Sequence, residues 1–409
     1  MTNGRIVIVG AGIAGATAAR TLRTAGYTGA IVLIGAEDEL PYRRPMVSKE
    51  MLAGTAVERR TLLEPAEFWQ SRGIEVRTGV TVASIEPDRA RVLLTDGEEL
   101  GYDSLLLATG ARPRGLPGAG AGVHTLRGRS DVAAVRSAID AGSLLIVGAG
   151  LIGCEVASTA TKLGARVTML DAGAAPLDRI APPVIGEFIR KLHADNGVDV
   201  VGGVLLTDIE QTAPGTVTAT AEDGRAWNAH AALVAIGAIP NISLASAAGI
   251  AVADGILVDE RYRTSAPGVY AAGDVAARLD LDTGVHRRDE HWNSAQAQGA
   301  AAAAAMLGTA PETAEVCWGW STQYGLNIQF AGRIEPTDEL VVRGAPGTPD
   351  FTVLGLREGR LAGAVGIGRP ADIRAARELI ARRAVLDPAV CADETVLLAA
   401  LVDLARAIN

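Results

Sequence analysis

The amino-acid sequence predicts an α/β protein with two Rossmann-like dinucleotide-binding domains and a C-terminal α+β domain. Three observations support this prediction. An apolar run that ends in a Gly-x-Gly-x-x-Gly turn lies near the start of the chain, the same arrangement recurs from residue 144, and residues 316–409 do not contain it. The length of 409 residues is sufficient for two or three domains.

The first nucleotide motif occupies residues 6–15. Residues 6–9 are apolar and β-branched, which is typical of a buried parallel strand. The three glycines that follow have the spacing that brings a helix N-terminus to a pyrophosphate. In this motif Gly10 allows the tight turn, Gly12 removes the side chain where the phosphates approach, and Gly15 lets the helix pack closely on the strand.

The segment after the first motif supplies an acid and several cations. Residues 30–34 predict a second parallel strand, and Glu37 follows near the position where an acid accepts hydrogen bonds from an adenosine ribose. The loop of residues 40–49 carries three cations: Arg43, Arg44 and Lys49. They are either ordinary surface charges or ligand contacts. We expect ligand contacts near the pyrophosphate, because the loop follows a nucleotide-binding strand.

The middle of the chain repeats the first pattern. Residues 74–106 predict short strands joined by turns, which return to the sheet in the apolar run 105–113. Residues 114–122 are rich in glycine and are the best candidate for a linker. A strand at 144–147 is followed by a second set of motif glycines: Gly148, Gly150 and Gly153. Asp171 ends the next strand and is the second candidate ribose acid.

Two complete units of strand, glycine loop, helix, strand and acid indicate one chain that binds two dinucleotides. The alternative is a duplicated domain that has lost one ligand. The second unit continues to the apolar run 232–241, which mirrors the end of the first. Gly273 and Asp274 follow a later short strand, where the acid can hold a ligand hydroxyl. A helix is predicted over 292–306, because its six consecutive alanines favour a helix.

These patterns predict the domain boundaries. The first domain is discontinuous and comprises residues 1–113 and 238–315, and the second comprises residues 114–237. Residues 316–409 form a third domain of strands followed by two helices, predicted at residues 371–384 and 393–407.

Composition excludes several classes of function. The net charge of −9 argues against nucleic acid as a partner. Residues 357–383 are the exception, with seven arginines, and their simplest interpretation is a solvated helix face. The three cysteines are far apart and form no CxxC motif, so neither a redox dithiol nor a zinc site is expected. No uncharged apolar run reaches about 18 residues, and no leader pattern is present, so we expect a cytoplasmic protein without a membrane span.

Over essentially its full length the chain resembles the FAD-dependent NADH:ferredoxin reductases of bacterial oxygenase systems, of the putidaredoxin-reductase type. These are flavoproteins with two dinucleotide-binding domains. The matching segments are residues 10–15, 40–49, 108–110, 147–155, 270–274, 288–292, 298–299 and 320–324. The resemblance implies that the first unit holds FAD and the second holds NADH.

The motifs and the resemblance together define two sets of candidate cofactor contacts. On the FAD side they are Gly10, Gly12, Ala14, Gly15, Glu37, Arg44, Lys49, Val82, Ala108, Thr109, Gly110, Arg127, Gly273, Asp274, Glu290, His291, Trp292 and Trp320. On the NAD side they are Gly148, Gly150, Leu151, Ile152, Gly153, Glu155, Asp171, Arg179, Ile236 and Gly237.

The resemblance also implies two catalytic residues. Lys49 is similar in position to the lysine near flavin N5 and O4, and Glu155 resembles its ion-pair partner. A cation at this place would stabilise the electron-rich reduced flavin, and the carboxylate would hold the cation in position. Asp171 would accept from the 2′-hydroxyl of NADH and repel the 2′-phosphate of NADPH, and the nearest arginine after it, Arg179, is eight residues away.

The absence of cysteine from residues 44–49 bears on which group accepts the electrons from the flavin. Disulfide reductases of the same superfamily carry a cysteine pair on the corresponding helix, beside the flavin. Electrons would therefore pass singly to a protein partner or go to oxygen. The resemblance implies a [2Fe–2S] ferredoxin that feeds a haem-thiolate monooxygenase or a ring-hydroxylating dioxygenase, with residues 357–383 as part of the docking face.

Two alternatives stay open. The first is an NADH oxidase or diaphorase without a protein partner. The second is an apoptosis-inducing-factor-like flavoprotein that acts as an NADH-responsive binding protein, for which long C-terminal insertions or a targeting segment would be expected. Three residues depart from the family pattern: Ala36 replaces an acid, Gly319 an aromatic residue and Thr322 another acid. The ribose contact consequently falls to Glu37.

Overall fold

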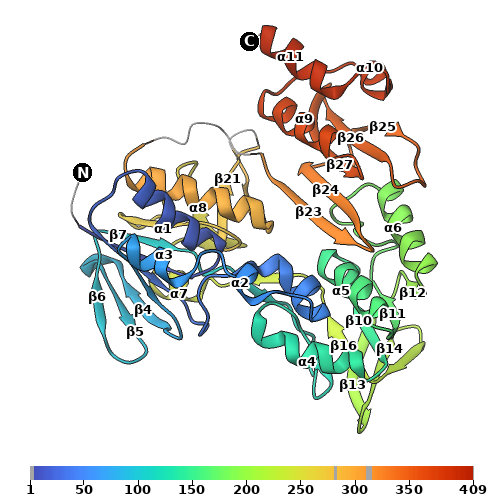
Figure 1. The fold of residues 1–409 in the computed structure, drawn as a ribbon, viewed down its shortest axis with the longest axis horizontal. Helices are drawn as coiled ribbons and strands as arrows, with labels where there is room; N and C mark the ends of the chain where they lie inside the picture. The colour runs from blue at the N-terminus through green and yellow to red at the C-terminus, as the bar shows by residue number, and fades with distance from the viewer. Residues whose placement is uncertain (1–3, 281–282, 310–315, 409) are drawn as a thin grey trace. The chain divides into compact units, whose positions relative to one another are not determined.

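The computed structural model describes residues 4–280, 283–309 and 316–408, which divide into two compact units (Figure 1). The first unit comprises the described parts of Met1–Arg43, Val57–Arg112 and Ala238–Glu315. The second comprises those of Arg44–Ala56, Pro113–Gly237 and Val316–Asn409. The division into three domains remains a prediction from the sequence.

The first unit is built on a parallel sheet in the order β20-β7-β1-β2-β3. Its strands are β1 (Arg5–Val9), β2 (Ala30–Ile34), β3 (Ile74–Arg77), β7 (Ser104–Leu107) and β20 (Val269–Ala271). In the central strand Val7 lies in register with Val32 on one side and Leu105 on the other. These three side chains are almost fully buried, as expected for a parallel sheet that is covered on both faces.

Two helices of the first unit pack closely on each other: α1 (Ile13–Thr24) and α8 (Trp292–Met306). A Cβ atom added at Gly299 of α8 would lie 2.1 Å from the carbonyl oxygen of Ala14 in α1. The alanine-rich composition of α8 therefore serves close helix packing, and the observed helix has the predicted bounds.

The remainder of the first unit consists of small sheets and short helices. One antiparallel sheet contains β4 (Val82–Glu86), β5 (Arg91–Leu94) and β6 (Glu99–Gly101). Another contains β18 (Val252–Ala253), β19 (Gly255–Val258), β21 (Ala276–Leu279) and β22 (His286–Arg287). The short elements are β8 (Ala111–Pro113), β17 (Ala238–Pro240), α2 (Glu58–Thr61), α3 (Ala66–Ser71) and α7 (Ser243–Ala247).

The second unit contains another parallel sheet, in the order β12-β11-β10-β16-β9. Its strands are β9 (Val123–His124), β10 (Ser143–Val147), β11 (Arg166–Leu170), β12 (Val198–Val201) and β16 (Ala231–Val234). The helices of this part are α4 (Arg129–Asp140), α5 (Leu151–Lys162) and α6 (Pro183–Asp195). An antiparallel sheet is formed by β13 (Leu206–Ala213), β14 (Thr216–Ala221) and β15 (Ala226–Ala229). The two parallel sheets confirm the predicted duplication of the Rossmann-like fold.

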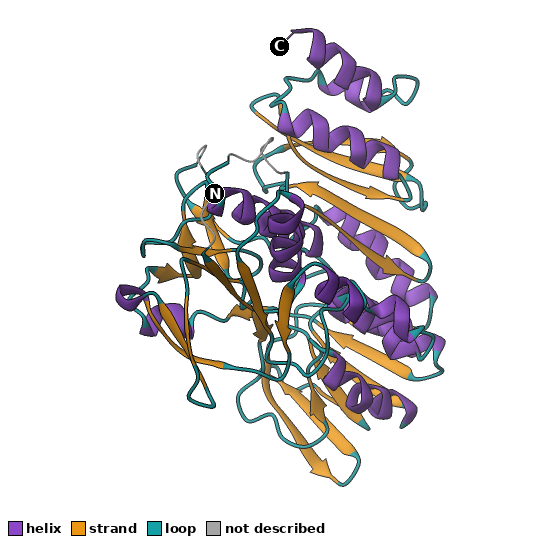
Figure 2. Ribbon diagram, turned by 60° about the vertical axis from the view of Figure 1, so that its left-hand side comes forward, coloured by secondary structure: helices purple, strands orange, loops and turns teal. Residues whose placement is uncertain are grey.

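The C-terminal part of the second unit is an antiparallel sheet in the order β23-β24-β27-β26-β25. Its strands are β23 (Trp318–Gln323), β24 (Leu326–Gly332), β25 (Glu339–Gly344), β26 (Phe351–Arg357) and β27 (Arg360–Ile367). Helix α9 (Pro370–Ala381) lies across one face of this sheet (Figure 2). This is the predicted α+β arrangement.

The last predicted helix begins later than expected. The sequence predicts a helix over 393–407, whereas the chain forms α10 (Pro388–Ala392), a turn, and then α11 (Leu398–Ile408). Asp387 caps α10 by accepting from the backbone N–H of Ala389 at 2.8 Å, and Pro388 occupies the first helical turn. The turn between the helices is closed by Asp393, whose side chain accepts from the N–H of Thr395.

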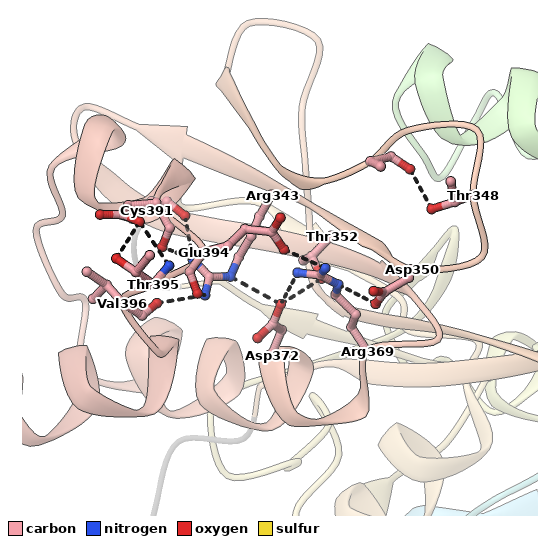
Figure 3. A network of polar contacts seen from close by, with 12 residues as sticks. Arg343, Thr348, Asp350, Thr352, Arg369, Asp372, Cys391, Glu394, Thr395 and Val396 are labelled. Atoms are coloured by element: carbon pink, nitrogen blue, oxygen red, sulfur yellow. Dashed lines mark hydrogen bonds and ion pairs between the residues drawn. The ribbon is translucent and has the colours of Figure 1, made fainter.

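A buried arginine holds this turn against the sheet (Figure 3). Arg343 of β25 is only 3% exposed, and its guanidinium faces the Asp372 carboxylate at 3.5 Å. The guanidinium also donates to the backbone carbonyls of Cys391, Asp393, Glu394 and Val396. Arg369 adds ion pairs to Asp350 at 2.7 Å and Glu394 at 2.6 Å. These contacts explain why the segment leaves the helical path that its periodicity predicts.

Candidate functional site

The first glycine loop joins β1 to α1 and leaves the helix N-terminus open. Gly10 has φ 116°, and a Cβ there would lie 2.0 Å from the carbonyl oxygen of Ala108. A Cβ at Gly15 would lie 2.0 Å from the carbonyl oxygen of Gly10. At Gly12, by contrast, no atom of the described residues comes within 4 Å of the Cβ position, and no side chain caps α1. The N–H groups of the first turn can therefore bind a phosphate.

The second glycine loop, between β10 and α5, has the same geometry. Gly148 has φ 104°, and its Cβ would lie 2.4 Å from the carbonyl oxygen of Ala235. A Cβ at Gly153 would lie 2.0 Å from the carbonyl oxygen of Gly148. Around Gly150 the described part of the chain again leaves the Cβ position open, and α5 has no side-chain cap. Each loop therefore fits the pyrophosphate of one dinucleotide.

The two candidate ribose acids lie at the ends of the second strands, as predicted, and both accept hydrogen bonds. The Oε2 atom of Glu37 accepts from the hydroxyl of Tyr42 at 2.7 Å. Asp171 accepts from the backbone N–H groups of Ala149, in the glycine loop, and of Gly173. Each carboxylate oxygen has further acceptor capacity for a ribose hydroxyl. Asp171 consequently also ties the second loop to the end of β11.

Other NAD-side candidates surround the second loop. Leu151 and Ile152 begin α5, and Ile152 is exposed. Arg179 is exposed and lies two residues after Leu177, whose backbone N–H donates to the carbonyl oxygen of Ala149. Ile236 and Gly237 follow β16 in the position that Thr109 and Gly110 occupy after β7.

The FAD-side candidates of the first unit come together around α1. A Cβ at Gly273 would lie 3.0 Å from the Cβ of Ala14, and the Gly273 N–H donates to the buried side chain of Gln298 at 2.9 Å. Asp274 is the next residue, between β20 and β21. Sequence reasoning omitted Gln298 as a site residue, although the motif 298–299 contains it.

Further candidates lie in the loops beside these strands. The hydroxyl of Thr109 donates to the carbonyl oxygen of Asn241 at 2.9 Å, and this loop also contains Ala108 and Gly110. Val82 is buried at the start of β4. Glu290 pairs with Arg288 at 2.6 Å, close to the start of α8 at His291 and Trp292. The adjacent Asn293 has a buried side-chain nitrogen without a hydrogen-bond partner among the described residues, as a group that awaits a ligand oxygen would.

The second unit contains a buried ion pair between the two candidate catalytic residues. Lys49 lies in a π-helical turn (η2, Val47–Met51), and its Nζ is 2.5 Å from Oε2 of Glu155 in α5. The side chains are 18% and 5% exposed, respectively. Ser48 donates to the same oxygen at 2.5 Å, and Ser321 of β23 donates to Oε1 at 2.8 Å. π-Helical turns often occur at functional sites. The structure brings Lys49 and Glu155 together as the resemblance implies, and it adds two serines.

The remaining FAD-side candidates are also part of the second unit. Arg44 donates to the backbone carbonyl of Arg127 at 3.3 Å. The backbone N–H of Arg127 donates to the Asp131 carboxylate at the start of α4. Trp320 lies in β23, with its ring 6.2 Å from that of Trp318. The contacts of all these residues with a cofactor stay predictions.

His193 of α6 is a buried histidine of the second unit whose pKa is strongly lowered. It is fully buried, and burial lowers its pKa to about 4. Between pH 6.5 and about 4 the unfolded chain binds a proton at His193 that the folded chain does not bind. The free energy of unfolding is therefore fully retained above pH 6.5 and falls as the pH falls through this window.

We expect a His193→Gln variant to lose this pH dependence. Between pH 7 and pH 5 the unaltered protein is expected to lose about 2 kcal/mol more than the variant, because the unfolded histidine has a pKa near 6.5. Urea-induced unfolding at both pH values measures the difference. His230, which contacts the hydroxyl of Ser143, provides a matched control as His230→Gln. Equal pH slopes for the unaltered protein and the His193 variant would contradict this assignment.

Within residues 4–280, 283–309 and 316–408, no group of three or more His, Cys, Asp or Glu side chains is placed so that it could hold a metal ion. No disulfide joins Cys154, Cys317 and Cys391, and burial raises the pKa of Cys154 and of Cys391. Among the helices that the structure describes, none is long and apolar enough to span a bilayer.

Comparison with known proteins agrees with these features. The family model described as pyridine nucleotide-disulphide oxidoreductase matches residues 4–299, and the model described as reductase C-terminal matches residues 318–402. The ferredoxin–NAD(+) reductase component of the anthranilate 1,2-dioxygenase system of Burkholderia cepacia is 40% identical over 395 residues, which cover 95% of this chain and 97% of that protein.

Two further similarities concern putidaredoxin reductase. The putidaredoxin reductase of Pseudomonas putida is 36% identical over 414 residues, covering 99% of this chain and 98% of that protein. The crystal structure of a covalent putidaredoxin reductase–putidaredoxin complex matches with a TM-score of 0.94 at 34% identity and covers 100% of both chains.

Proposed function

The chain belongs to the pyridine nucleotide-disulphide oxidoreductase family, and from this premise we propose that it is an FAD-dependent NADH:ferredoxin reductase of an oxygenase system. Relatives that match nearly the full chain are ferredoxin reductase components, including that of anthranilate 1,2-dioxygenase. One observation in the structure carries the proposal. Two glycine loops with the same open geometry, at Gly12 and Gly150, offer separate pyrophosphate sites for FAD and NADH.

Bound FAD supplies the chemistry that accepts a hydride from NADH and releases the two electrons singly. The loop of residues 10–15 would bind its pyrophosphate, Glu37 its adenosine ribose and Asp274 its ribityl chain. The loop of residues 148–153 and Asp171 would bind NADH. Lys49 would supply a compact positive charge that favours the electron-rich reduced ring, and Glu155 holds that charge in place.

A protein acceptor fits the placement of the cysteines. None of them lies in the η2 segment, and Cys154 is a buried thiol whose Sγ donates to the carbonyl oxygen of Ala149. A thiol with a raised pKa is a poor redox nucleophile. Electrons from a bound flavin would therefore pass to an acceptor outside the chain.

Reduction of a ferredoxin tests this function directly. Purified protein, NADH, a [2Fe–2S] ferredoxin encoded beside it and cytochrome c are combined, and ferredoxin-dependent cytochrome reduction is measured. Reduction well above the rate without ferredoxin is expected. Rapid oxygen consumption without any gain from ferredoxin would instead identify an NADH oxidase. Cofactor binding without turnover of any acceptor would identify a binding protein.

We propose the Arg-rich segment 357–383 as part of the docking face for an acidic ferredoxin. Some of its arginines are engaged within the domain: Arg357 pairs with Asp338 at 2.8 Å, and the guanidinium of Arg377 lies 4.3 Å from the ring centre of Trp318. Arg374 and Arg382 of the α9 region are exposed. They can attract negative charge without giving up an ion pair that holds the fold.

A double charge reversal tests this docking face. Arg374→Glu with Arg382→Glu is expected to raise the KM for ferredoxin about tenfold and to weaken its salt dependence, because rim charges steer association. Reduction of ferricyanide by NADH should stay unchanged. Arg166→Glu, an exposed position of β11, is the matched control. An unchanged KM for the double variant would place the docking face elsewhere.

We further propose that Asp171 sets the preference for NADH. Asp171→Ala is expected to reduce the ratio of kcat/KM for NADH over NADPH by about one order of magnitude, since a carboxylate beside a 2′-phosphate is a like-charge contact. Because Asp171 also accepts from Ala149 and Gly173, the KM for NADH should rise as well. Asp171→Asn, which keeps an acceptor oxygen, separates the two effects. Comparable kcat/KM values for both nucleotides in the unaltered protein would contradict the proposal.

The reaction is assigned to the cytoplasm as part of this proposal, since NADH is supplied there. Fractionation of the source cells checks the assignment.

A further inference from the structure

A continuous chain of hydrogen bonds leads from Glu155 to a buried histidine that the proposed reaction does not use. Ser321 contacts Oε1 of Glu155, and the side-chain nitrogen of Gln323 contacts the Ser321 hydroxyl at 3.2 Å. Oε1 of Gln323 lies 3.1 Å from Nε2 of His193. Nδ1 of His193 lies 3.0 Å from the hydroxyl of Tyr324. The chain connects α5, β23 and α6, which all belong to the second unit.

Each hydrogen bond in this series is donated in the direction of the Glu155 carboxylate. A glutamine oxygen can only accept, so Nε2 of His193 carries the proton and Nδ1 accepts from Tyr324. Gln323 then donates to Ser321, and Ser321 donates to Glu155. Burial lowers the pKa of His193 to about 4 and keeps its ring neutral at pH 7, as this arrangement requires. Hydrogen bonds aligned in one direction polarise each other and strengthen the last acceptor contact.

The strand period explains why these side chains face Glu155. Alternate residues of a strand point to the same side, so Ser321 and Gln323 share one face of β23, and both are fully buried. Thr322 points to the other face and is partly exposed. The departure from the family pattern at Thr322 therefore leaves the chain of hydrogen bonds intact.

Tyr324, the last residue in this series of hydrogen bonds, adopts a strained backbone conformation. Tyr324 and Gly325 form the two-residue turn between β23 and β24, with φ values of 52° and 85°. Such a turn favours Asn-Gly, because a bulky residue at positive φ is sterically unfavourable. The contacts of Tyr324 include a hydrogen bond from its backbone N–H to Ser158 at 2.7 Å and one from its hydroxyl to His193. Asparagine would fit this position with less backbone strain, so the presence of tyrosine points to a role beyond the turn.

We propose that His193, Gln323 and Tyr324 are positioning residues that orient Glu155, through Ser321, and thereby hold Lys49 in place. The opposite oxygen of Glu155 accepts from Lys49 and Ser48, so any rotation of the carboxylate moves the ammonium group. The effect of Lys49 on the flavin rests on the proposed function. The positioning of Lys49 by Glu155 does not depend on the proposed function.

Chemical labelling of lysine amines tests the positioning directly, because the chain contains only Lys49, Lys162 and Lys191. The flavin-loaded protein is treated briefly with acetic anhydride, and the rate at each lysine is measured by mass spectrometry. Lys191 is the internal reference, since it lies on α6 with His193 and pairs with Asp195 at 2.8 Å. An unchanged rate at Lys191 reports an intact helix. Lys162 lies over the ring of Tyr324 and is not a neutral reference.

Two variants interrupt the chain of hydrogen bonds in different ways. His193→Leu removes both ring nitrogens, and Tyr324→Asn removes the terminal donor while it supplies the residue that the turn favours. In both variants we expect Lys49 to be acetylated several-fold faster relative to Lys191. Tyr324→Asn is expected to keep or raise the thermal unfolding temperature, which separates positioning from stability. Thr352→Val, a fully buried hydroxyl that contacts Asp372, is the matched control and should leave Lys49 unchanged.

The midpoint potential of the bound flavin gives the second measurement. A roughly tenfold loss in the preference for reduced over oxidised flavin, or about 30 mV toward negative values, is expected in both variants. Faster labelling of Lys49 with an unchanged potential would support the positioning and would contradict the role of Lys49 at the flavin. An unchanged labelling rate at Lys49 in folded Tyr324→Asn protein would overturn the inference, whatever the result with ferredoxin.

Discussion

Replacement of Gly12 by aspartate is expected to yield a folded protein without bound FAD, whereas the same replacement at Gly150 should yield a flavin-containing protein that does not use NADH. Both glycines have extended backbone angles, with φ −73° and −76°, that any residue can adopt. Both are N-cap positions with open space around the Cβ, and aspartate is a favourable N-cap. Its carboxylate would occupy the N–H groups intended for phosphate and repel the pyrophosphate.

The expected effects of this matched pair are large. Like charges in contact cost several kcal/mol, so the affinity for each dinucleotide should fall by at least about 100-fold. Flavin absorbance of the purified proteins and the KM for NADH measure the two losses. Thermal unfolding of Gly12→Asp should be compared with unaltered protein stripped of FAD, because a bound cofactor itself stabilises a fold. Loss of FAD from Gly150→Asp, or its retention in Gly12→Asp, would contradict the assignment of FAD to the first loop and NADH to the second.

Replacement of Lys49 by methionine is expected to produce the second large effect. Methionine retains the volume of the stem but leaves the Glu155 carboxylate buried without its cation. Breaking a buried pair in this way costs about 3–5 kcal/mol of unfolding free energy. If Lys49 also stabilises reduced flavin, flavin reduction by NADH should slow roughly 100-fold. Stopped-flow absorbance measures the reduction rate, and urea-induced unfolding measures the stability.

The double variant separates the two contributions of Lys49. Lys49→Met combined with Glu155→Gln removes both charges, so most of the stability should return, since replacing a buried pair by neutral groups is often nearly neutral. The slow flavin reduction should persist, because the cation is still absent. Recovery of both properties in the double variant would contradict a role of Lys49 beyond its pairing with Glu155.

The glycine loops and parallel strands could be predicted because their signals are local. The apolar runs at residues 6–9 and 144–147 and the glycines after them occupy consecutive positions, and both runs form the predicted strands β1 and β10. The predicted helix over 292–306 is confirmed as α8 for the same reason. The helix predicted at 393–407 begins only at Leu398, because Arg343, distant in sequence, draws the carbonyls of residues 391–396 into a turn.

The features of the candidate site likewise divide into those that the sequence predicts and those that only the structure reveals. The sequence alone determined two dinucleotide loops, their strand-end acids and the absence of a cysteine pair, since each depends on residue type and spacing within one short segment. Only the tertiary structure decided which polar groups surround Glu155. Ser48, Ser321 and His193 come from three separate segments and meet through long-range packing, to which no local periodicity corresponds. The strained turn at Tyr324 is visible only in the backbone angles, because its sequence, Tyr-Gly, does not distinguish a φ of 52° from an ordinary turn.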